Sequence, residues 1–308
     1  MPRVSVVVIT YRQEDIVHET IESVLAQTMG DFELILSDDA SPDGTLDVLH
    51  RYAAQDDRIR VVAAAQNGGI TANCNQGLQH ATGDLLCMIG GDDLMLPDRL
   101  ALQAEAMDAN PGAAACISSS QAFRDGTGET LATSNPIRRF GSTTFGTADI
   151  LESANTLTAA SAWMFRRSAC PDRFEPMLPI ASDVYFFLET SLAGPIIAIE
   201  PVLTRYRIRE GSAVSRGLGD DPYVMRALME ARHPEFLPHI RRARGALFGF
   251  EGTRRLFDDD PMARLFFGEA LRADPRNKRA WAGWLAAHLP SVVREPVLQR
   301  LRARRKRG

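Results

Sequence analysis

The sequence predicts an α/β protein with a doubly wound, mostly parallel sheet, followed by a C-terminal helical region. The first observation is the apolar, β-branched run VSVVVI at residues 4–9, which is typical of a strand covered by helices on both faces. The second is a repeated alternation of such runs with segments of helical spacing, the pattern of parallel strands joined by crossover helices. The third is the end of this alternation near Pro222, after which only helical segments follow.

The elements follow in order from the spacing of apolar residues, as in the first helix, where Ile21, Val24 and Leu25 lie on one face. The predicted strands are residues 4–9, 32–36, 59–62, 85–89, 114–117, 196–199 and 203–206. The predicted helices are residues 16–25, 46–52, 71–80, 99–107, 147–153 and 183–192, then 223–231, 236–248, 261–273, 276–288 and 290–305. Clusters of Gly, Thr and Ser between residues 124 and 146 predict long loops over the sheet.

A Gly- and Ser-rich stretch at residues 211–219 predicts the division of the chain. We expect residues 1–215 to form the domain that contains the sheet. Residues 216–308 then form the helical region, which ends in a basic tail.

Composition excludes several classes of protein. The net charge of −4 over 308 residues gives no general reason to expect nucleic acid binding. Four cysteines without a Cys-x-x-Cys pair predict reduced thiols in a cytoplasmic protein, and six histidines without metal-ligand spacing argue against structural zinc. No apolar run approaches the roughly 20 residues that span a bilayer. We therefore expect a cytoplasmic protein, either free or peripheral at the inner face of the membrane.

Two adjacent acids, Asp92 and Asp93, follow the apolar strand at residues 85–89 and two glycines. Paired carboxylates at the end of a buried strand are costly unless positive charge meets them. Mg²⁺ or Mn²⁺, held by one or two carboxylates and by substrate phosphates, meets that requirement. The alternative is that one acid caps the helix that begins near Pro97.

Polar side chains also follow the other strands of the first half, and in a doubly wound sheet such strand ends meet at one crevice. They are Thr10, Tyr11 and Arg12 after the first strand, Asp38 and Asp39 after the second, and Asp92 and Asp93 after the fourth. Each has an ordinary alternative explanation as a helix cap, a packed ring or a turn former. Their convergence favours the metal site, and the absence of a glycine-rich phosphate loop leaves a metal to neutralise the phosphates.

Four segments, VVVITYRQEDIVHETIESVLAQT, ELILSDDASPDGT, NGGITANCNQGLQHATGD and MIGGDDLMLPDRL, together resemble family 2 glycosyltransferases of the GT-A fold. The resemblance covers roughly residues 3–210. It implies that residues 1–215 form a nucleotide-sugar-binding catalytic domain. It also implies an inverting, metal-dependent transfer of a sugar from a nucleotide diphosphate sugar to an acceptor hydroxyl. By resemblance alone, the base is uracil.

The resemblance also assigns residues of the donor site. Thr10, Tyr11 and Asp39 match the nucleoside pocket, with the Tyr11 ring near the base and Asp39 accepting from a base nitrogen. Asn73 matches a polar position near the donor. Asp92 matches the residue that contacts the ribose or the surroundings of the metal, and Asp93 matches the ligand of Mn²⁺ or Mg²⁺.

Two departures from the family pattern concern the metal and the leaving group. Many relatives have Asp-x-Asp-Asp where this chain has Gly90, Gly91, Asp92 and Asp93, so one carboxylate is missing. Some relatives have a histidine ligand in the loop after the last strand, where residues 206–215 offer Arg207 and Arg209 instead. These arginines fit a lid over the diphosphate, and a solvated surface loop is the alternative.

Direct displacement at the anomeric carbon needs a base for the acceptor proton. The resemblance assigns this role to Asp183, at the start of a helix, with Ser182 as the helix cap. The alternative for Asp183 is a first-turn acid that favours the helix dipole. Trp163 resembles the segment that meets the acceptor, or else belongs to the core.

The C-terminal helix combines an apolar stripe with many cations, which suits an anionic membrane surface and a lipid-linked acceptor. The alternative is an amphipathic helix packed on its own domain. The basic residues are Arg294, Arg300, Arg302, Arg304, Arg305, Lys306 and Arg307.

Two other functions remain open. One is a non-catalytic nucleotide-sugar-binding protein, suggested by Gly90 and Ser182. The other is a sugar nucleotidyltransferase, although the segment TYRQED lacks the glycine-rich basic loop that binds a triphosphate. Saccharide or lipid-linked acceptors are the expected second substrates.

Overall fold

The computed structural model describes residues 1–153, 159–209, 219–258, 260–290 and 293. It divides into two compact units, each considered by itself. The first unit comprises residues 1–150 and 155–225, and the second comprises residues 151–154 and 226–308. The boundary expected between residues 215 and 216 lies outside the described residues.

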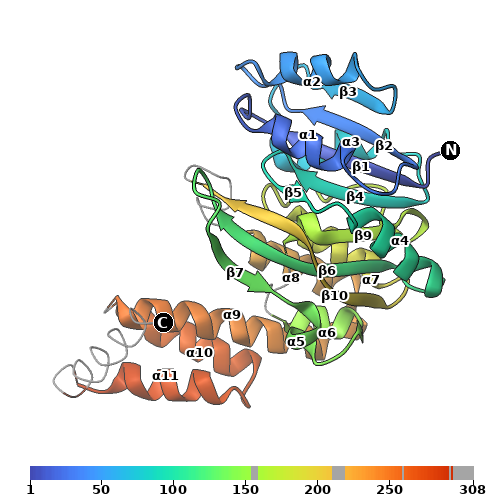
Figure 1. Cartoon of the computed structure of the whole chain (residues 1–308). Helices are drawn as coiled ribbons and strands as arrows, with labels where there is room; N and C mark the ends of the chain where they lie inside the picture. Colours follow the sequence, from blue (N-terminus) through green and yellow to red (C-terminus); the bar gives the residue numbers. More distant parts are fainter. Residues whose placement is uncertain (154–158, 210–218, 259, 291–292, 294–308) are drawn as a thin grey trace. The chain divides into compact units, whose positions relative to one another are not determined.

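The sequence alternates strands and helices as expected (Figure 1). The strands are β1 (Val4–Thr10), β2 (Phe32–Asp38), β3 (Ile59–Ala63), β4 (Leu85–Gly90), β5 (Leu94–Met95), β6 (Ala115–Arg124), β7 (Thr130–Ser134), β8 (Thr144–Phe145), β9 (Trp163–Arg166) and β10 (Ile196–Ile208). The helices up to residue 232 are α1 (Val17–Leu25), α2 (Thr45–Ala53), α3 (Ile70–Leu78), α4 (Arg99–Ala109), α5 (Pro136–Phe140), α6 (Thr147–Glu152), α7 (Ser182–Ser191) and α8 (Asp221–Arg232). The later helices are α9 (Leu237–Phe257), α10 (Ala263–Ala273) and α11 (Lys278–His288), and short 3₁₀ helices lie at Ala160–Ala162, Arg167–Ala169 and Pro234–Phe236.

The sheet has the order β3-β2-β1-β4-β9-β6-β10-β5, with β7 beside β6 and β8 beside β10. Strands β3, β2, β1 and β4 are parallel, whereas β9 runs antiparallel to both of its neighbours. The chain moves outward from β1 through β2 to β3 and then crosses back to place β4 on the other side of β1. The order therefore reverses between β1 and β4, and in such sheets ligands bind outside the carboxyl ends of the strands at this point.

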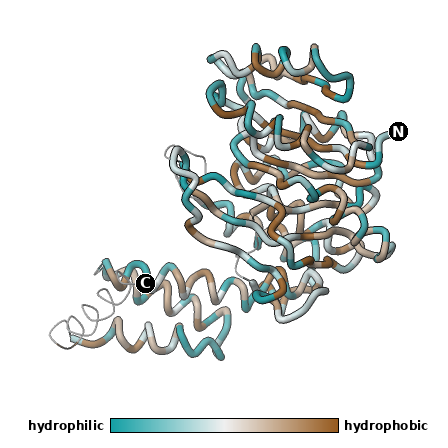
Figure 2. Tube along the Cα trace, viewed as in Figure 1, coloured by the Kyte–Doolittle hydropathy of each residue, from teal (hydrophilic) through white to brown (hydrophobic). Residues whose placement is uncertain are grey.

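Helices cover both faces of the sheet, as the apolar strands predict. On one face α1, α2 and α4 pack with Val4, Val6 and Val8 of β1 in a single core cluster. On the other face lie α3, against β1 and β2, and α7, whose Phe186 and Phe187 meet the aromatic side chains of β9. Figure 2 shows hydrophobic residues along the central strands.

Gly77 of α3 faces Val7 of β1 with no room for a side chain. A Cβ at this position would lie 2.4 Å from Val7 Cγ1. We expect Gly77→Ala to destabilise the protein, because overpacking a core costs about 1–3 kcal/mol. The higher helix propensity of alanine offsets only roughly 1 kcal/mol of that cost. Urea unfolding measures the difference. Gly112→Ala is the control, since nothing lies within 4 Å of its Cβ; equal stability of the two variants contradicts the prediction.

Three expectations about secondary structure were wrong. Residues 124–146 are not long loops, because they contain β7, α5 and β8 at the edges of the sheet. The strands expected at 196–199 and 203–206 are one strand, β10, with register shifts near Val202 that carry the interrupted apolar pattern past Glu200 and Pro201. The helix expected at 236–248 continues to Phe257.

The second unit contains the antiparallel helices α9, α10 and α11, which pack around the fully buried Phe267. Gly252 and Gly283 admit this ring, since a Cβ on either would lie 3.0 Å or less from it. Within the described part of the chain, no helix combines the length and apolarity needed to cross a bilayer. The helix expected at residues 290–305 lies almost wholly outside the described residues.

Candidate active site

A cavity of about 420 Å³ lies at the carboxyl ends of β1 and β4, where the strand order reverses. Six of the seven residues predicted for donor binding line it: Thr10, Tyr11, Asp39, Asn73, Asp92 and Arg209. The rest of its wall is Ile9, Gln13, Asn67, Gly69, Ile70, Gly90, Pro179 and Ile180. The register explains the convergence, because Thr10 pairs with Asp38 and Ile9 pairs with Gly90 at one edge of the sheet.

At one end of the cavity, Asp39 is fixed by the turn that precedes α3. Its carboxylate accepts hydrogen bonds from the backbone of Gly68 (2.7 Å) and Gly69 (2.8 Å) and from Asn67 Nδ2 (2.9 Å). A carboxylate offers about four acceptor positions, so among the described residues one position remains for a ligand N–H. The adjacent Ala40 has φ of +55°, a strained conformation of the kind that clusters at functional sites.

Tyr11 is the exposed aromatic side chain of the cavity wall, with 38% of its surface accessible. The Arg12 guanidinium lies 5.3 Å from the ring centroid. Arg12 itself has φ of +55°. The strained turn after β1 thus holds an aromatic face at the edge of the cavity.

Thr10 and Asn73 are almost fully buried and tie the strand ends together. Thr10 Oγ1 donates to Asp38 Oδ1 (3.0 Å), while Asn73 Nδ2 donates to the Thr10 carbonyl oxygen (3.1 Å). Asn73 Oδ1 accepts from Ser37 Oγ (2.7 Å). Their polar groups therefore shape the cavity wall from β1, β2 and α3.

At the other end of the cavity, Asp92 faces Arg209. An Arg209 Nε to Asp92 Oδ2 distance of 3.3 Å makes an ion pair. Gly90 gives the carboxylate room, because a Cβ there would lie 2.8 Å from Asp92 Oδ1. Burial raises the pKa of Asp92, and the charge of Arg209 opposes that effect. The structure thus places a positive group against the carboxylate that faces the cavity.

Asp93, the residue after Asp92, is 2% exposed and does not line the cavity. One carboxylate oxygen accepts from the Arg207 backbone N–H (2.9 Å), and the other accepts from Ser161 Oγ. Its carbonyl oxygen accepts from Thr20 Oγ1 (2.8 Å). Burial and the negative charge of Asp92 raise the pKa of Asp93. The predicted metal ligand is therefore already bonded on both oxygens.

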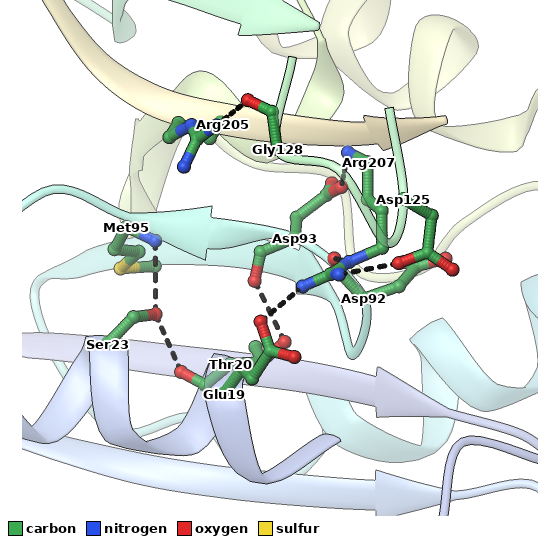
Figure 3. Close-up of polar contacts among 10 residues, drawn as sticks. All are labelled: Glu19, Thr20, Ser23, Asp92, Asp93, Met95, Asp125, Gly128, Arg205 and Arg207. Carbon is green, nitrogen blue, oxygen red and sulfur yellow. Dashed lines mark hydrogen bonds and ion pairs between the residues drawn. The ribbon is translucent and has the colours of Figure 1, made fainter. Parts of the chain in front are cut away.

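Arg207 lies within β10 and its side chain is 4% exposed. Its guanidinium donates to Glu19 (2.7 Å), to Asp125 (2.8 Å) and to the Asp92 carbonyl oxygen (2.7 Å), as Figure 3 shows. These bonds connect α1, β10 and the turn that carries both acids. Arg207 is thus used inside the protein and belongs to neither the predicted lid nor a solvated loop; residues 210–215 of that loop lie outside the described residues.

We expect Arg207→Met to destabilise the protein by about 2–3 kcal/mol, because a buried cation with three acceptors is removed while its half-exposed carboxylate partners regain water. Arg209→Met is the matched control, since Arg209 pairs with Asp92 at the cavity wall. That variant should keep its midpoint of urea unfolding and bind nucleotide diphosphates more weakly. Similar midpoints for both variants contradict the assigned roles.

Asp183 occupies the first turn of α7, shortly after Pro179 and Ile180 of the cavity wall, and does not itself line the cavity. Its carboxylate accepts from the Val184 N–H (2.8 Å), and burial raises its pKa to about 6. Tyr206 of β10 lies near three acids of the site: burial, then the charges of Asp93, Asp92 and Asp183, raise its pKa to about 12. A carboxyl that titrates near pH 6 suits a general base at neutral pH.

Three alternatives from the sequence are resolved by these contacts. Ser182 is not the cap of α7: the cap residue is Ala181, and Ser182 Oγ accepts from Thr71 Oγ1 (2.8 Å). Neither Asp92 nor Asp93 caps α4, whose cap position is Asp98. Trp163 is 2% exposed and packs on Phe187, so it belongs to the core.

Sequence reasoning missed several residues of the site. Gln13, Pro179 and Ile180 line the cavity, and Ser161 bonds Asp93. Asn67 and Gly69, in the turn before α3, also line the cavity. No local pattern marks Ser161 or Ile180, because each reaches the site from an element distant in sequence.

The residues around Asp92 fit a divalent cation with few protein ligands. Within the part of the chain that the structure describes, no cluster of three or more His, Cys, Asp or Glu side chains could hold a metal. Hard cations such as Mg²⁺ keep one or two carboxylates and take substrate phosphates as further ligands. Asp92 is one such carboxylate at the cavity wall, and in this structure Arg209 supplies its counter-charge.

The sheet, with a polar cavity at its switch point, has the GT-A-type transferase fold. The sequence profile of "Glycosyl transferase family 2" matches residues 5–174, and this chain belongs to that family.

Relatives and solved structures agree. The chain is 46% identical over 103 residues to the putative glycosyltransferase EpsE of Bacillus subtilis, covering 33% of this chain and 37% of that protein. It is 30% identical over 226 residues to the succinoglycan biosynthesis protein ExoO of Rhizobium meliloti, covering 71% and 64%. The matches thus span about a third to two thirds of these relatives' lengths.

Two solved structures share the fold. S. aureus TarS 1–349 in complex with UDP-GlcNAc has a TM-score of 0.71 at 20% identity, covering 96% of this chain and 92% of that one. The mannosyltransferase PcManGT from Pyrobaculum calidifontis, in complex with GDP-Man and Mn²⁺, has a TM-score of 0.56 at 20% identity, covering 98% and 80%.

Proposed function

We propose that this chain is an inverting, metal-dependent glycosyltransferase that moves a sugar from a UDP-linked donor to an acceptor hydroxyl in polysaccharide or glycolipid synthesis. The observation that carries the proposal is one cavity that has an aromatic face and a hydrogen-bonding acid at one end and a carboxylate with an arginine at the other. A base and a diphosphate are the two ends of a nucleotide. TarS, which shares the fold, binds UDP-GlcNAc.

The nucleoside is assigned to the end of the cavity that Tyr11 and Asp39 form. The Tyr11 ring offers a face on which a base stacks. Asp39, held by three donors, keeps one acceptor position for the N–H of a uracil ring. Thr10 and Asn73 hold the strand ends that form the wall beneath the nucleoside.

The diphosphate is assigned to the end of the cavity at Asp92. Asp92, which faces the cavity, is our choice for the direct metal ligand, and the buried Asp93 fixes the turn that carries it through its bonds to Ser161 and Arg207. A bound Mn²⁺ or Mg²⁺ supplies positive charge that stabilises the diphosphate as a leaving group. Arg209, released from Asp92 when the site fills, can pair with a phosphate oxygen.

Asp183 is assigned as the general base. It takes the proton of the acceptor hydroxyl while that oxygen forms the new bond to the anomeric carbon. The bond from the anomeric carbon to the phosphate oxygen breaks, the electron pair leaves with the nucleoside diphosphate, and the configuration inverts.

The acceptor class and a contact with membrane rest on the sequence and on the relatives. ExoO is named for succinoglycan biosynthesis, and a further relative at 34% identity over 101 residues glucosylates a pyrophosphoryl-undecaprenol glycan. The basic segment after residue 293 would draw the chain to anionic lipid at the cytoplasmic face of the membrane.

A panel of nucleotides tests the proposal. We expect UDP and UDP-sugars with Mn²⁺ to raise the melting temperature more than GDP, dTDP or Mn²⁺ alone, because a ligand of the native state stabilises it. Turnover of the stabilising donor, followed as UDP release with polysaccharide or lipid-linked acceptors, completes the test. Binding without release over every acceptor supports the non-catalytic alternative, and the absence of nucleotide-dependent stabilisation refutes the proposal.

A further inference from the structure

Asp221 connects the start of α8 to the loop that precedes Asp183. It is 4% exposed, and its Oδ2 atom accepts hydrogen bonds from the backbone N–H groups of Ile180 (2.8 Å) and Ala181 (2.7 Å). Ile180 lines the cavity and Ala181 is the cap position of α7. One buried carboxylate therefore holds both a wall of the donor cavity and the helix that carries the assigned base.

Asp221 takes the place of a helix cap for α7, whose own cap residue is an alanine. The first N–H groups of a helix lack partners inside the helix, and the cap position of α7 has no side-chain hydrogen bond of its own. Asp221 supplies the missing acceptor from a different element. Because it is also the first residue of α8, its charge lies at the N-terminal ends of two helices, where a negative charge is favoured.

We propose that Asp221 is a positioning residue for the reaction: it fixes the backbone at residues 180–181 and so sets the place of Asp183 beside the cavity. The part that concerns Asp183 rests on the proposed function. Asp221 makes no assigned contact with donor or acceptor, and it acts through the loop and through its charge.

The charge of Asp221 has an effect that neighbouring groups do not share. Two causes raise the pKa of Asp183 to about 6. Burial is the larger, and the negative charge of Asp221 adds to it. Among the described residues, Cys74 of α3 and Tyr206 of β10 are further titratable groups that interact with Asp183. Both have raised pKa values and stay neutral at pH 7, so they add no charge there.

Asp221→Asn and Asp221→Ala separate the two effects. Asparagine keeps a carbonyl oxygen for the two N–H groups but removes the charge, whereas alanine removes both. Asp220→Asn is the matched control, because Asp220 is the exposed neighbouring acid. Hydrogen exchange of the Ile180 and Ala181 amides reports the anchor, and the carboxyl NMR titration of Asp183, assigned with Asp183→Asn, reports the charge.

We expect Asp221→Ala to exchange these two amides about 10- to 100-fold faster, as loss of a hydrogen bond to a charged group implies, and to lose turnover about 100-fold through misplacement of Asp183. Asp221→Asn should move the titration of Asp183 to lower pH, while Asp220→Asn leaves it in place. If Asp221→Ala does not fold, the titration of Asp221→Asn decides.

Unchanged amide exchange in Asp221→Ala, or equal Asp183 titrations in Asp221→Asn and Asp220→Asn, would overturn the assignment. Neither readout needs substrate. If the wild type turns over no nucleotide sugar but the amides of Asp221→Ala exchange faster, the proposed function fails and the anchor stands.

Discussion

Asp183→Asn is expected to lower kcat about 10³-fold, because a positioned general base contributes roughly 10²–10⁴-fold. An asparagine of the same shape keeps the donor cavity, so KM for the donor should change little. In the wild type, kcat should fall as the pH drops below about 6, since burial raises the pKa of Asp183 to that value and the protonated carboxyl cannot accept a proton. Steady-state rates from pH 5 to 8 measure both effects.

Stability distinguishes loss of the base from loss of the fold. The pKa of Asp183 is higher in the folded protein than its ordinary value of 3.8, so the native state binds this proton more tightly than the unfolded chain does. Its contribution to stability is therefore fully present below pH 4 and is lost as the pH rises to about 6. We expect Asp183→Asn to melt at or above the wild-type temperature at pH 7. Asp172→Asn, at an exposed acid, should change neither rate nor melting; an active Asp183→Asn enzyme would exclude Asp183 as the base.

The sheet and the edge that holds the site were predictable because they depend on short-range patterns. Apolar β-branched runs alternating with helical spacing indicate a parallel sheet, and the strand ends of a parallel sheet meet at one edge. Thr10, Asp39 and Asp92 lie at or just after the ends of their strands, so their convergence on one cavity could be expected before any contact was known. The family resemblance added roles for these residues.

The contacts that organise the acids could not be predicted, because they join residues far apart in the chain. Arg207 bonds Glu19 across 188 positions and Asp125 across 82. On sequence alone, Arg207 and Arg209 are equivalent cations two residues apart. The end of β10 separates them: Arg207 lies within the strand and its guanidinium bonds Glu19 and Asp125, whereas Arg209 follows the last strand residue and lines the cavity.

The polar edge strand β7 and the continuity of β10 could not be predicted for a related reason. Residues 130–134 read TLATS, and an edge strand of polar residues carries little of the apolar signal that marks a buried strand. In β10, Glu200 and Pro201 interrupt the apolar pattern, and the register shift that accommodates them depends on pairing with β6.

The assignment of Asp92, rather than Asp93, as the metal ligand predicts a large effect of one substitution on metal-dependent binding and on turnover. We expect Asp92→Asn to abolish the Mn²⁺-dependent part of UDP binding and to lower turnover by about two to three orders of magnitude. A metal ion contributes several kcal/mol of charge stabilisation to the leaving group, and each 1.36 kcal/mol is about tenfold in rate. Titration of Mn²⁺ with UDP present, by calorimetry and by thermal shift, measures the binding.

Asp93→Asn is the matched variant, since it changes the adjacent buried acid in the same way. Its carbonyl oxygen can still accept from the Arg207 N–H, so the turn should hold and the Mn²⁺ dependence should persist. Turnover should fall only about 10-fold, as is usual for a partner that orients a metal ligand. The opposite result, with Mn²⁺ binding lost in Asp93→Asn and kept in Asp92→Asn, would return the metal to Asp93. That result would also require the metal to reach a carboxylate that does not line the cavity and whose two oxygens each accept a hydrogen bond, from Ser161 and from Arg207.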